Sequence, residues 1–289
     1  HQSILYSNET IGITLAGIPI SGVSNNVLIK GENDSVWHYD VNKTLINGQD
    51  QYGGQTVQNG VYVYTNGNFI TEDAWANVSG FTSGYTDPET GHSKLIGFSA
   101  DGYPIYGPYG YSDPTDSSSG VTLMTSSYEE VGSLPSSRPK AVNVTVTSST
   151  TTYNYITANS TVGINPGMRI TSINDSEPSA DVWVIDNSLK TAEGLPEYVG
   201  SVNQIKLSSN VTVNAGDTLK FEFLLGAFIE DYEYDPEETE GSLDQYNGRF
   251  CVTPEFPNGT YAYFITQDTS NNPVYPYILG PAYFGDTNT

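Results

Sequence analysis

Only four side chains in this sequence are imidazoles or thiols, the groups that most often bind transition metals: His1, His38, His92 and Cys251. An amino-terminal histidine can chelate copper through its amine and its imidazole. His1 with His38 or His92 as partner would therefore suit a copper-dependent secreted oxidase. We rank this alternative last, because the surrounding sequence does not match such an enzyme and the chain can form no internal disulfide.

Cys251 stands between Phe250 and Val252 and has no second cysteine to pair with. This context predicts a small buried hydrophobic residue rather than a nucleophile. The sequence has no G-x-S-x-G nucleophile motif, and nothing distinguishes a catalytic pair among its 33 acidic residues. We therefore expect a protein without enzymatic activity, with no catalytic residues and no metal centre.

The acidic run at residues 230–240 (EDYEYDPEETE) packs seven carboxylates into a short segment. Such density costs free energy unless water or a cation neutralises it. The run lacks the D-x-D-x-D-G spacing of a calcium loop, so the sequence favours a solvated loop. Ca²⁺ at residues 230–240 is the alternative, and we expect no other cofactor.

Asparagines in N-x-S/T triplets are frequent and predict glycosylation sites on surface turns. The asparagines concerned are Asn8, Asn33, Asn42, Asn77, Asn143, Asn159, Asn174, Asn210 and Asn258.

Charge and composition limit the partners. The net charge of −23 excludes a phosphate-binding surface, which needs clustered lysine and arginine, so we expect no nucleic-acid partner. No apolar run approaches the roughly 18 residues of a membrane helix, so we expect no membrane insertion. With few charged residues, solubility depends on Asn, Ser, Thr and Gly, which is typical of extracellular proteins. No signal segment precedes His1, so we expect a removed leader or a piece of a longer chain.

Hydrophobic periodicity indicates strands throughout. Apolar residues alternate with polar ones in segments such as 218–223 (TLKFEF), and no segment keeps a helical period over a dozen residues. Asn-Gly and Asp-Gly pairs, which tolerate positive φ, separate these segments and predict hairpins. The fold class is therefore all-β.

A shift in composition near residues 133–139 (SLPSSRP) predicts a boundary, because tyrosine density falls beyond it and returns after residue 225. We expect an irregular tyrosine-rich host domain formed by residues 1–138 and 225–289. Residues 139–224 would form an inserted, smaller module like a β-sandwich or barrel.

Tyrosines are densest at residues 97–114 (GFSADGYPIYGPYGYSDP). Turns at Asp101-Gly102 and at residues 107–108, with Pro104 between them, would hold the rings in a rigid frame. These rings can form the core of the domain or present a surface to sugars or proteins. We expect the core role, with the contact surface as the alternative.

The segment 11–20 (IGITLAGIPI) alternates well enough to form a strand near the start of the chain. It can pair within its own domain, or complete the sheet of a neighbouring copy and produce a polymer. Both alternatives remain open at this point.

Six ordered motifs resemble the YHYH domain family. The matching residues are Tyr52-Gly53-Gly54-Gln55, Tyr62-Val63-Tyr64-Thr65, Asp101 to Pro108, Leu243 to Gly248, Tyr261-Ala262-Tyr263-Phe264 and Pro276 to Gly280. The resemblance covers roughly residues 1–135 and 225–289. It implies that the family-motif residues are Tyr62, Tyr64, Asp101, Gly102, Pro104, Tyr106, Gly107, Asp244, Asn247, Gly248, Tyr261 and Tyr263.

The chain departs from this family pattern at every histidine. Val63, Thr65, Ala262 and Phe264 stand where the two Tyr-His-Tyr-His strands would carry imidazoles. If relatives use those histidines to bind a metal, this chain has lost the ligands.

The variant resembles family members carried by phages and bacteria in tail-like or surface structures, and residues 139–224 resemble a β module of phage structural proteins. The resemblance implies a structural subunit of an extracellular assembly, a surface fibre or a virion appendage. Its partners would be copies of itself, other surface or virion proteins, or glycans. The alternative is a carbohydrate-binding module that uses the tyrosine-rich surface.

Overall fold

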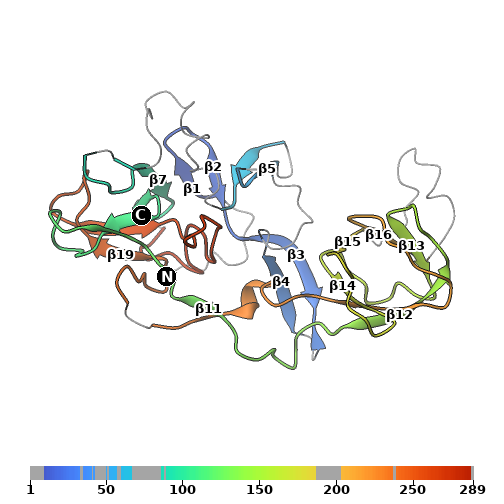
Figure 1. Cartoon of the computed structure of the whole chain (residues 1–289). Helices are drawn as coiled ribbons and strands as arrows, with labels where there is room; N and C mark the ends of the chain where they lie inside the picture. Colours follow the sequence, from blue (N-terminus) through green and yellow to red (C-terminus); the bar gives the residue numbers. More distant parts are fainter. Residues whose placement is uncertain are drawn as a thin grey trace.

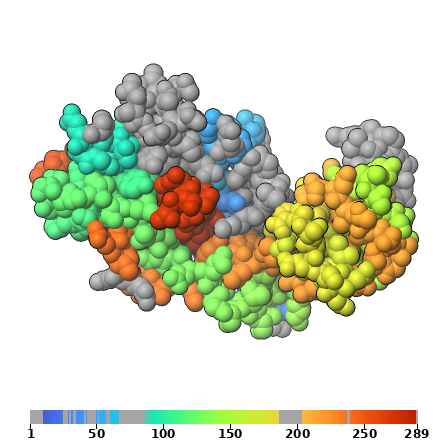
Figure 2. All heavy atoms as spheres, viewed as in Figure 1, coloured from blue at the N-terminus to red at the C-terminus, as the bar shows by residue number. Residues whose placement is uncertain are grey.

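The computed structural model describes residues 10–32, 35–40, 42, 50, 52–56, 60–66, 86–87, 89–186, 203–236 and 239–287. Within them the chain is all-β, as predicted, and its only helix is a single 3-10 turn, η5 (Ile229–Asp231). No helix in the described part has the length and apolar character needed to cross a bilayer. Two main sheets form two lobes, of which the six-stranded sheet makes the smaller one (Figure 1, Figure 2).

The larger sheet has eight strands. In spatial order they are β19 (Gly248–Cys251), β20 (Thr260–Phe264), β8 (Pro104–Tyr106), β7 (Leu95–Ser99), β1 (Thr10–Thr14), β2 (Pro19–Ser21), β6 (Tyr62–Tyr64) and β5 (Gly54–Thr56). The two strands that carry the Tyr-x-Tyr motifs, β6 and β20, are therefore each second from an edge, at opposite ends of one sheet.

Strand alternation sends the residues of β20 to opposite faces of this sheet. Tyr261 and Tyr263 join one core cluster together with Ile105 of β8. Ala262 and Phe264 join a second cluster with Tyr106 and Cys251. The motif tyrosines and the positions between them therefore serve different cores.

Of the two alternatives for residues 11–20, the structure shows pairing within the chain's own sheet. This segment forms β1 and β2, which pair with each other, while β7 pairs with the free side of β1 and β6 pairs with the free side of β2. Both strands lie in the interior of the sheet and expose no free edge.

The smaller sheet has six strands, in the order β14 (Arg169–Ile173), β17 (Thr218–Glu222), β12 (Val142–Ser148), β13 (Tyr155–Ala158), β16 (Gln204–Leu207) and β15 (Val184–Asp186). Ile170 N donates to Val182 O at 2.9 Å, and Val184 N donates to Met168 O at 2.8 Å. These bonds join the first strand to the last, so the sheet closes into a barrel. Independent folding of residues 139–224 stays a prediction.

The core of this barrel extends beyond the predicted boundaries at residues 139 and 224. Trp37 and Tyr39 of β4 (Val36–Asp40) and Phe228 pack into the same cluster as the barrel residues. Tyr39 Oη also donates to Pro166 O at 2.7 Å. Residues from the flanking chain therefore close one end of the barrel.

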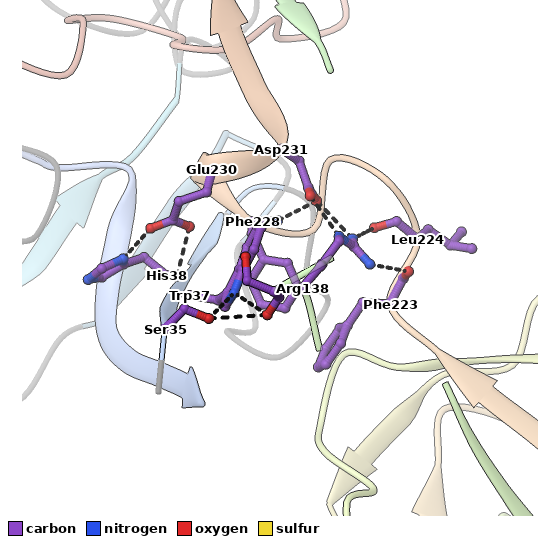
Figure 3. Close-up of polar contacts among 10 residues, drawn as sticks. Ser35, Trp37, His38, Arg138, Phe223, Leu224, Phe228, Glu230 and Asp231 are labelled. Carbon is purple, nitrogen blue, oxygen red and sulfur yellow. Dashed lines mark hydrogen bonds and ion pairs between the residues drawn. The ribbon is translucent and has the colours of Figure 1, made fainter. Parts of the chain in front are cut away.

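A buried ion pair lies where the barrel meets the rest of the chain (Figure 3). Arg138 donates from Nε to Asp231 Oδ1 at 2.7 Å and from its NH2 nitrogen to Oδ2 at 2.9 Å. The same guanidinium donates to the carbonyl oxygens of Phe223 and Leu224. Its carbon lies 5.1 Å from the centre of the Phe228 ring. This contact holds both ends of the barrel segment, because Arg138 precedes β12 and Phe223 follows β17.

Three two-stranded ribbons complete the fold. They are β3 (Ser24–Lys30) with β4, β9 (Tyr109–Tyr111) with β10 (Val121–Leu123), and β11 (Tyr128–Glu130) with β18 (Tyr232–Tyr234). Figure 1 shows β3 and β4 between the large sheet and the barrel.

Candidate functional site

The second Tyr-x-Tyr motif lies in a hairpin formed by β19 and β20, which we call the C-terminal tyrosine hairpin (residues 244–264). The Tyr261 hydroxyl donates to the Asp244 carboxylate, 2.9 and 3.0 Å from its two oxygens. Asp244 Oδ1 also accepts the backbone N–H groups of Tyr246 and Gly248. The Tyr261 and Tyr263 rings meet edge to face, 5.2 Å apart at 82°.

The first Tyr-x-Tyr motif repeats this arrangement at the other end of the sheet, in the N-terminal tyrosine hairpin (residues 50–66). The Tyr62 hydroxyl donates to Asp50 Oδ2 at 2.6 Å. Asp50 Oδ1 accepts the backbone N–H groups of Tyr52 and Gly54. The Tyr62 and Tyr64 rings lie 5.5 Å apart at 80°.

The backbones of the two hairpins correspond as well. Gly53 and Asn247 occupy equivalent left-handed positions, with φ of 71° and 65°. Gly54 pairs with Tyr64, and Gly248 pairs with Tyr263. The two hairpins are therefore copies of one structural unit.

A glycine lies beneath the first tyrosine of each hairpin. A Cβ atom on Gly248 would lie 2.5 Å from the Tyr261 hydroxyl oxygen, and a Cβ atom on Gly54 would collide with the Tyr62 hydroxyl. Only a residue without a side chain lets the phenol cross the edge strand to reach its aspartate.

Each aspartate turn also occupies backbone groups at the edge of the sheet. Asp50 N donates to Gly54 O and Asp244 N donates to Gly248 O, both at 2.9 Å. These groups are thus unavailable to another strand, which is a common protection of sheet edges against aggregation. At this one position of each edge strand, the turn therefore blocks pairing with another strand.

The two hairpins differ in what covers them. In the C-terminal hairpin the Phe284 ring stacks on Tyr261 at 3.7 Å and 9°, and Phe284 N donates to the Tyr263 hydroxyl at 2.8 Å. Tyr263 in turn donates to Asp101 Oδ2, which also accepts Gly285 N. Tyr261 and Tyr263 are consequently buried, whereas Tyr62 keeps 36% of its surface exposed.

Because the two hairpins are covered differently, the pKa values of their aspartates shift in opposite directions. Burial raises the pKa of Asp244 above its usual range, against the lowering effect of its hydrogen bonds. The slight burial of Asp50 also acts to raise its pKa, but hydrogen bonds from Tyr62, Gly54 and Tyr52 outweigh that effect and lower it. Burial and the neighbouring aspartate raise the pKa of both Tyr62 and Tyr261, so both phenols stay protonated donors at neutral pH.

The four positions that would carry imidazoles in a Tyr-His-Tyr-His strand are filled by packed side chains. Val63, Thr65, Ala262 and Phe264 are all at most 4% exposed. Thr65 Oγ1 lies 3.2 Å from both Gly53 O and Asn42 Oδ1. None of these side chains can act as a base or bind a transition metal.

The other family-motif residues support the same sheet. The Tyr106 hydroxyl, fully buried, contacts Thr253 Oγ1 and Glu255 Oε2 at 2.8 Å each. Gly102 adopts φ of 86° in the turn between β7 and β8, which confirms the predicted turn at Asp101-Gly102. Gly107 packs closely against Ser93, because a Cβ atom on Gly107 would lie 2.8 Å from Ser93 Oγ. Pro104 is buried.

The tyrosine frame at residues 97–114 contributes mainly to the core, as expected. Tyr106 and Tyr111 are at most 3% exposed. Tyr103 is half-buried, 5.4 Å from the rings of both Tyr261 and Phe284, and Tyr109 is also half-buried. The frame therefore offers little free ring surface.

Of the residues considered for metal chemistry, His38 and His92 contact different neighbours. His1 lies outside the described residues. His92 is fully buried against Tyr106 and Tyr111, and burial lowers its pKa. The His38 ring contacts Glu230 (Figure 3). Among the residues described, no group of three or more His, Cys, Asp or Glu side chains could hold a metal ion.

Two carboxylates of the acidic run form contacts within the chain, since Glu230 contacts His38 and Asp231 pairs with Arg138. Glu237 and Glu238 lie outside the described residues. Cys251 is buried, as predicted, and burial raises the pKa of its thiol.

The predicted glycosylation sites differ in exposure. Asn8, Asn33 and Asn77 lie outside the described residues. Asn42 is half-buried, and its side chain bonds to Thr65 and Asn66. The remaining asparagines are exposed: Asn143, Asn159, Asn174, Asn210 and Asn258.

Sequence reasoning missed Asp50, Glu255 and Phe284. The signal for Asp50 was present, because residues 50–54 read DQYGG and residues 244–248 read DQYNG. Each segment precedes a Tyr-x-Tyr strand, so aligning the two would have paired Asp50 with Asp244. No comparable signal marks Glu255 or Phe284.

Comparison with known proteins gives one match. A family model described as YHYH protein matches residues 1–174 and 174–276. Searches of curated proteins and of solved structures found no match.

Proposed function

Because the chain belongs to the YHYH protein family, we propose that it is a non-enzymatic structural subunit of an extracellular assembly. The assembly would be a filament, a surface fibre, or a tail or fibre component of a virion. Its partners would be further copies of the chain or other proteins of the same assembly.

The observation that carries this proposal is that the motif residues of the two tyrosine hairpins bond and pack within the chain. Three tyrosine hydroxyls of the hairpins donate to carboxylates of the same chain. The pairs are Tyr62 with Asp50, Tyr261 with Asp244, and Tyr263 with Asp101. The intervening positions hold buried side chains that cannot exchange protons. This arrangement rigidifies a sheet and supports a mechanical role.

Charge and composition support the location. The net charge of −23 and the scarcity of lysine and arginine oppose nucleic-acid binding. The exposed N-x-S/T asparagines, Asn143 and Asn258 among them, suit an extracellular surface.

Negative-stain electron microscopy of the purified chain, over a wide range of concentrations, tests the proposal. We expect ordered polymers or rings of constant width. A uniform population of single particles at every concentration would contradict a self-assembling subunit. Turnover of a substrate would contradict the non-enzymatic assignment.

One observation favours carbohydrate binding as a second candidate. Tyr62 is partly exposed and its hydroxyl bonds to the exposed carboxylate of Asp50, and an aromatic ring beside a carboxylate suits a sugar. A glycan array probed with the purified chain would then give a signal that Tyr62→Ala removes. Tyr103→Ala would test the half-buried frame in the same way.

A further inference from the structure

In the C-terminal tyrosine hairpin, the outer face of the first tyrosine ring binds a phenylalanine ring. Phe284 lies flat on Tyr261, with ring centres 3.7 Å apart, and three further aromatic rings, Tyr103, Tyr246 and Phe250, meet it edge to face. A phenylalanine ring delivered from another part of the chain therefore fits the outer face of this unit.

The N-terminal tyrosine hairpin has the same unit with its first tyrosine partly uncovered. Tyr62 matches Tyr261 in its aspartate bond, its glycine beneath and its angle to the next tyrosine. Its 36% exposure contrasts with 1% for Tyr261. In the described part of the chain, the Tyr62 ring contacts no aromatic ring other than Tyr64. Val61 beside it is 46% exposed, so the exposed neighbours of the ring include an apolar side chain as well as the Asp50 carboxylate that binds its hydroxyl.

The opposite end of the same sheet exposes a phenylalanine. Phe250 lies on the edge strand β19 and is 65% exposed, more than any other described aromatic side chain. Its ring already meets Tyr261 and Phe284 edge to face, at 5.4 and 5.2 Å, so it is held in place by its neighbours. Aromatic side chains, phenylalanine among them, are enriched in the cores of protein interfaces.

From these two surfaces we propose that copies of this chain associate head to tail, with Phe250 of one copy anchored on the Tyr62 ring of the next. The inference rests on the proposed assembly function and names its contact. The two surfaces lie at opposite ends of one eight-stranded sheet (Figure 1), so the contact is heterologous and leaves one surface of each kind free at the ends. Repetition of such a contact produces an open chain or a ring of copies.

Mass photometry and sedimentation velocity on the full chain test the contact. Wild type should show species of two, three and more copies that grow with concentration. Phe250→Ser and Tyr62→Ala should each remain single copies where wild type associates. Tyr153→Ser, which alters a ring 53% exposed on the barrel, is the matched control and should associate like wild type.

Mixing the two deficient variants gives the sharpest result. The Tyr62→Ala copy still offers Phe250 and the Phe250→Ser copy still offers Tyr62, so the mixture should form pairs and nothing longer. Tyr62→Phe keeps the ring and loses only the hydroxyl, so it should still associate if ring contact drives the interface. Thermal melting of each variant checks that it is folded.

Two outcomes overturn the inference and separate it from the proposed function. Polymers that persist unchanged in folded Phe250→Ser and Tyr62→Ala would overturn the contact but leave the assembly function in place. Wild type that stays a single copy at every concentration would overturn both.

Discussion

At the scale of single residues, the recurring device is a phenol hydroxyl held by a carboxylate. Besides the two hairpins, Tyr277 donates to the buried Asp40 at 2.5 Å and Tyr106 to Glu255. A chain without disulfides can stiffen a loop-rich sheet in this way, because each bond also satisfies a polar group that would be costly to bury alone.

Removing the hydroxyl of the first tyrosine in each hairpin should cost more stability where its hydrogen bond is buried than where it is exposed. Tyr261→Phe leaves the partly buried Asp244 without its phenol donor, so it should lower the free energy of unfolding by about 1–3 kcal/mol. Tyr62→Phe, at an exposed aspartate that water can reach, should cost less than about 1 kcal/mol. Urea unfolding of both variants measures the difference, and equal losses would contradict the role of burial.

The two aspartates should shift stability with pH in opposite directions. The pKa of Asp50 is lowered on folding, so its contribution is present above its ordinary value of 3.8 and is lost as pH falls through the folded pKa. The pKa of Asp244 is raised, so its contribution is present below 3.8 and is lost as pH rises through the folded pKa.

Unfolding free energies measured across acidic pH for Asp50→Asn and Asp244→Asn test this assignment. Relative to wild type, Asp50→Asn should lose less stability on acidification below pH 3.8. Asp244→Asn should lose less stability as the pH rises above 3.8. The same pH dependence of the free energy of unfolding in both variants would contradict opposite pKa shifts of the two aspartates.

At the scale of elements, each edge strand needs a glycine beneath a tyrosine ring. Gly248→Ala should cost about 1–3 kcal/mol, because its Cβ would meet the buried Tyr261 ring and the Ala262 carbonyl oxygen at 2.7 Å or less. Gly132→Ala is the matched control, since a Cβ there meets nothing within 4 Å. Chemical denaturation compares them, and a neutral Gly248→Ala would contradict the close approach.

The connection between barrel and host depends on the Arg138–Asp231 pair. Arg138→Met leaves the fully buried Asp231 carboxylate without its partner, so it should lower stability by about 3–5 kcal/mol. The double variant Arg138→Met with Asp231→Leu should recover part of that loss, because no buried charge is then left alone. Denaturant unfolding of the single and double variants measures both effects, and an unaffected single variant would contradict a structural pair.

At the scale of the whole molecule, charge is distributed unevenly between the two parts. Residues 139–224 carry 8 acidic and 5 basic residues, whereas the rest of the chain carries 25 and 5. Copies that meet through the large sheet therefore repel one another, and apolar contacts must overcome this repulsion.

Salt should consequently promote assembly. Raising ionic strength from about 0.01 to 0.15 M shortens the screening length from about 30 to 8 Å, which weakens repulsion between copies and leaves ring contacts intact. Sedimentation velocity over a sodium chloride series should show larger species at higher salt. Dissociation on adding salt would instead identify ion pairs as the main attraction.

The all-β class, the turn at Asp101-Gly102 and the motif tyrosines follow from the sequence alone. These features depend on local rules, namely alternation with period two and the tolerance of Gly and Asn for positive φ. The sequence also predicts that Cys251 is buried. The repeat of DQYGG and DQYNG was equally present, and it predicts Asp50 once the two segments are aligned.

Which of the two tyrosine hairpins is covered depends on long-range contacts that the sequence pattern does not reveal. Tyr62 and Tyr261 have nearly the same local sequence, yet Phe284 returns from the end of the chain to stack on one of them. The closure of the barrel and the burial of β1 and β2 within the large sheet depend on contacts of the same kind. Such contacts join residues far apart in the chain, and local pattern carries no information about which distant segment reaches which surface.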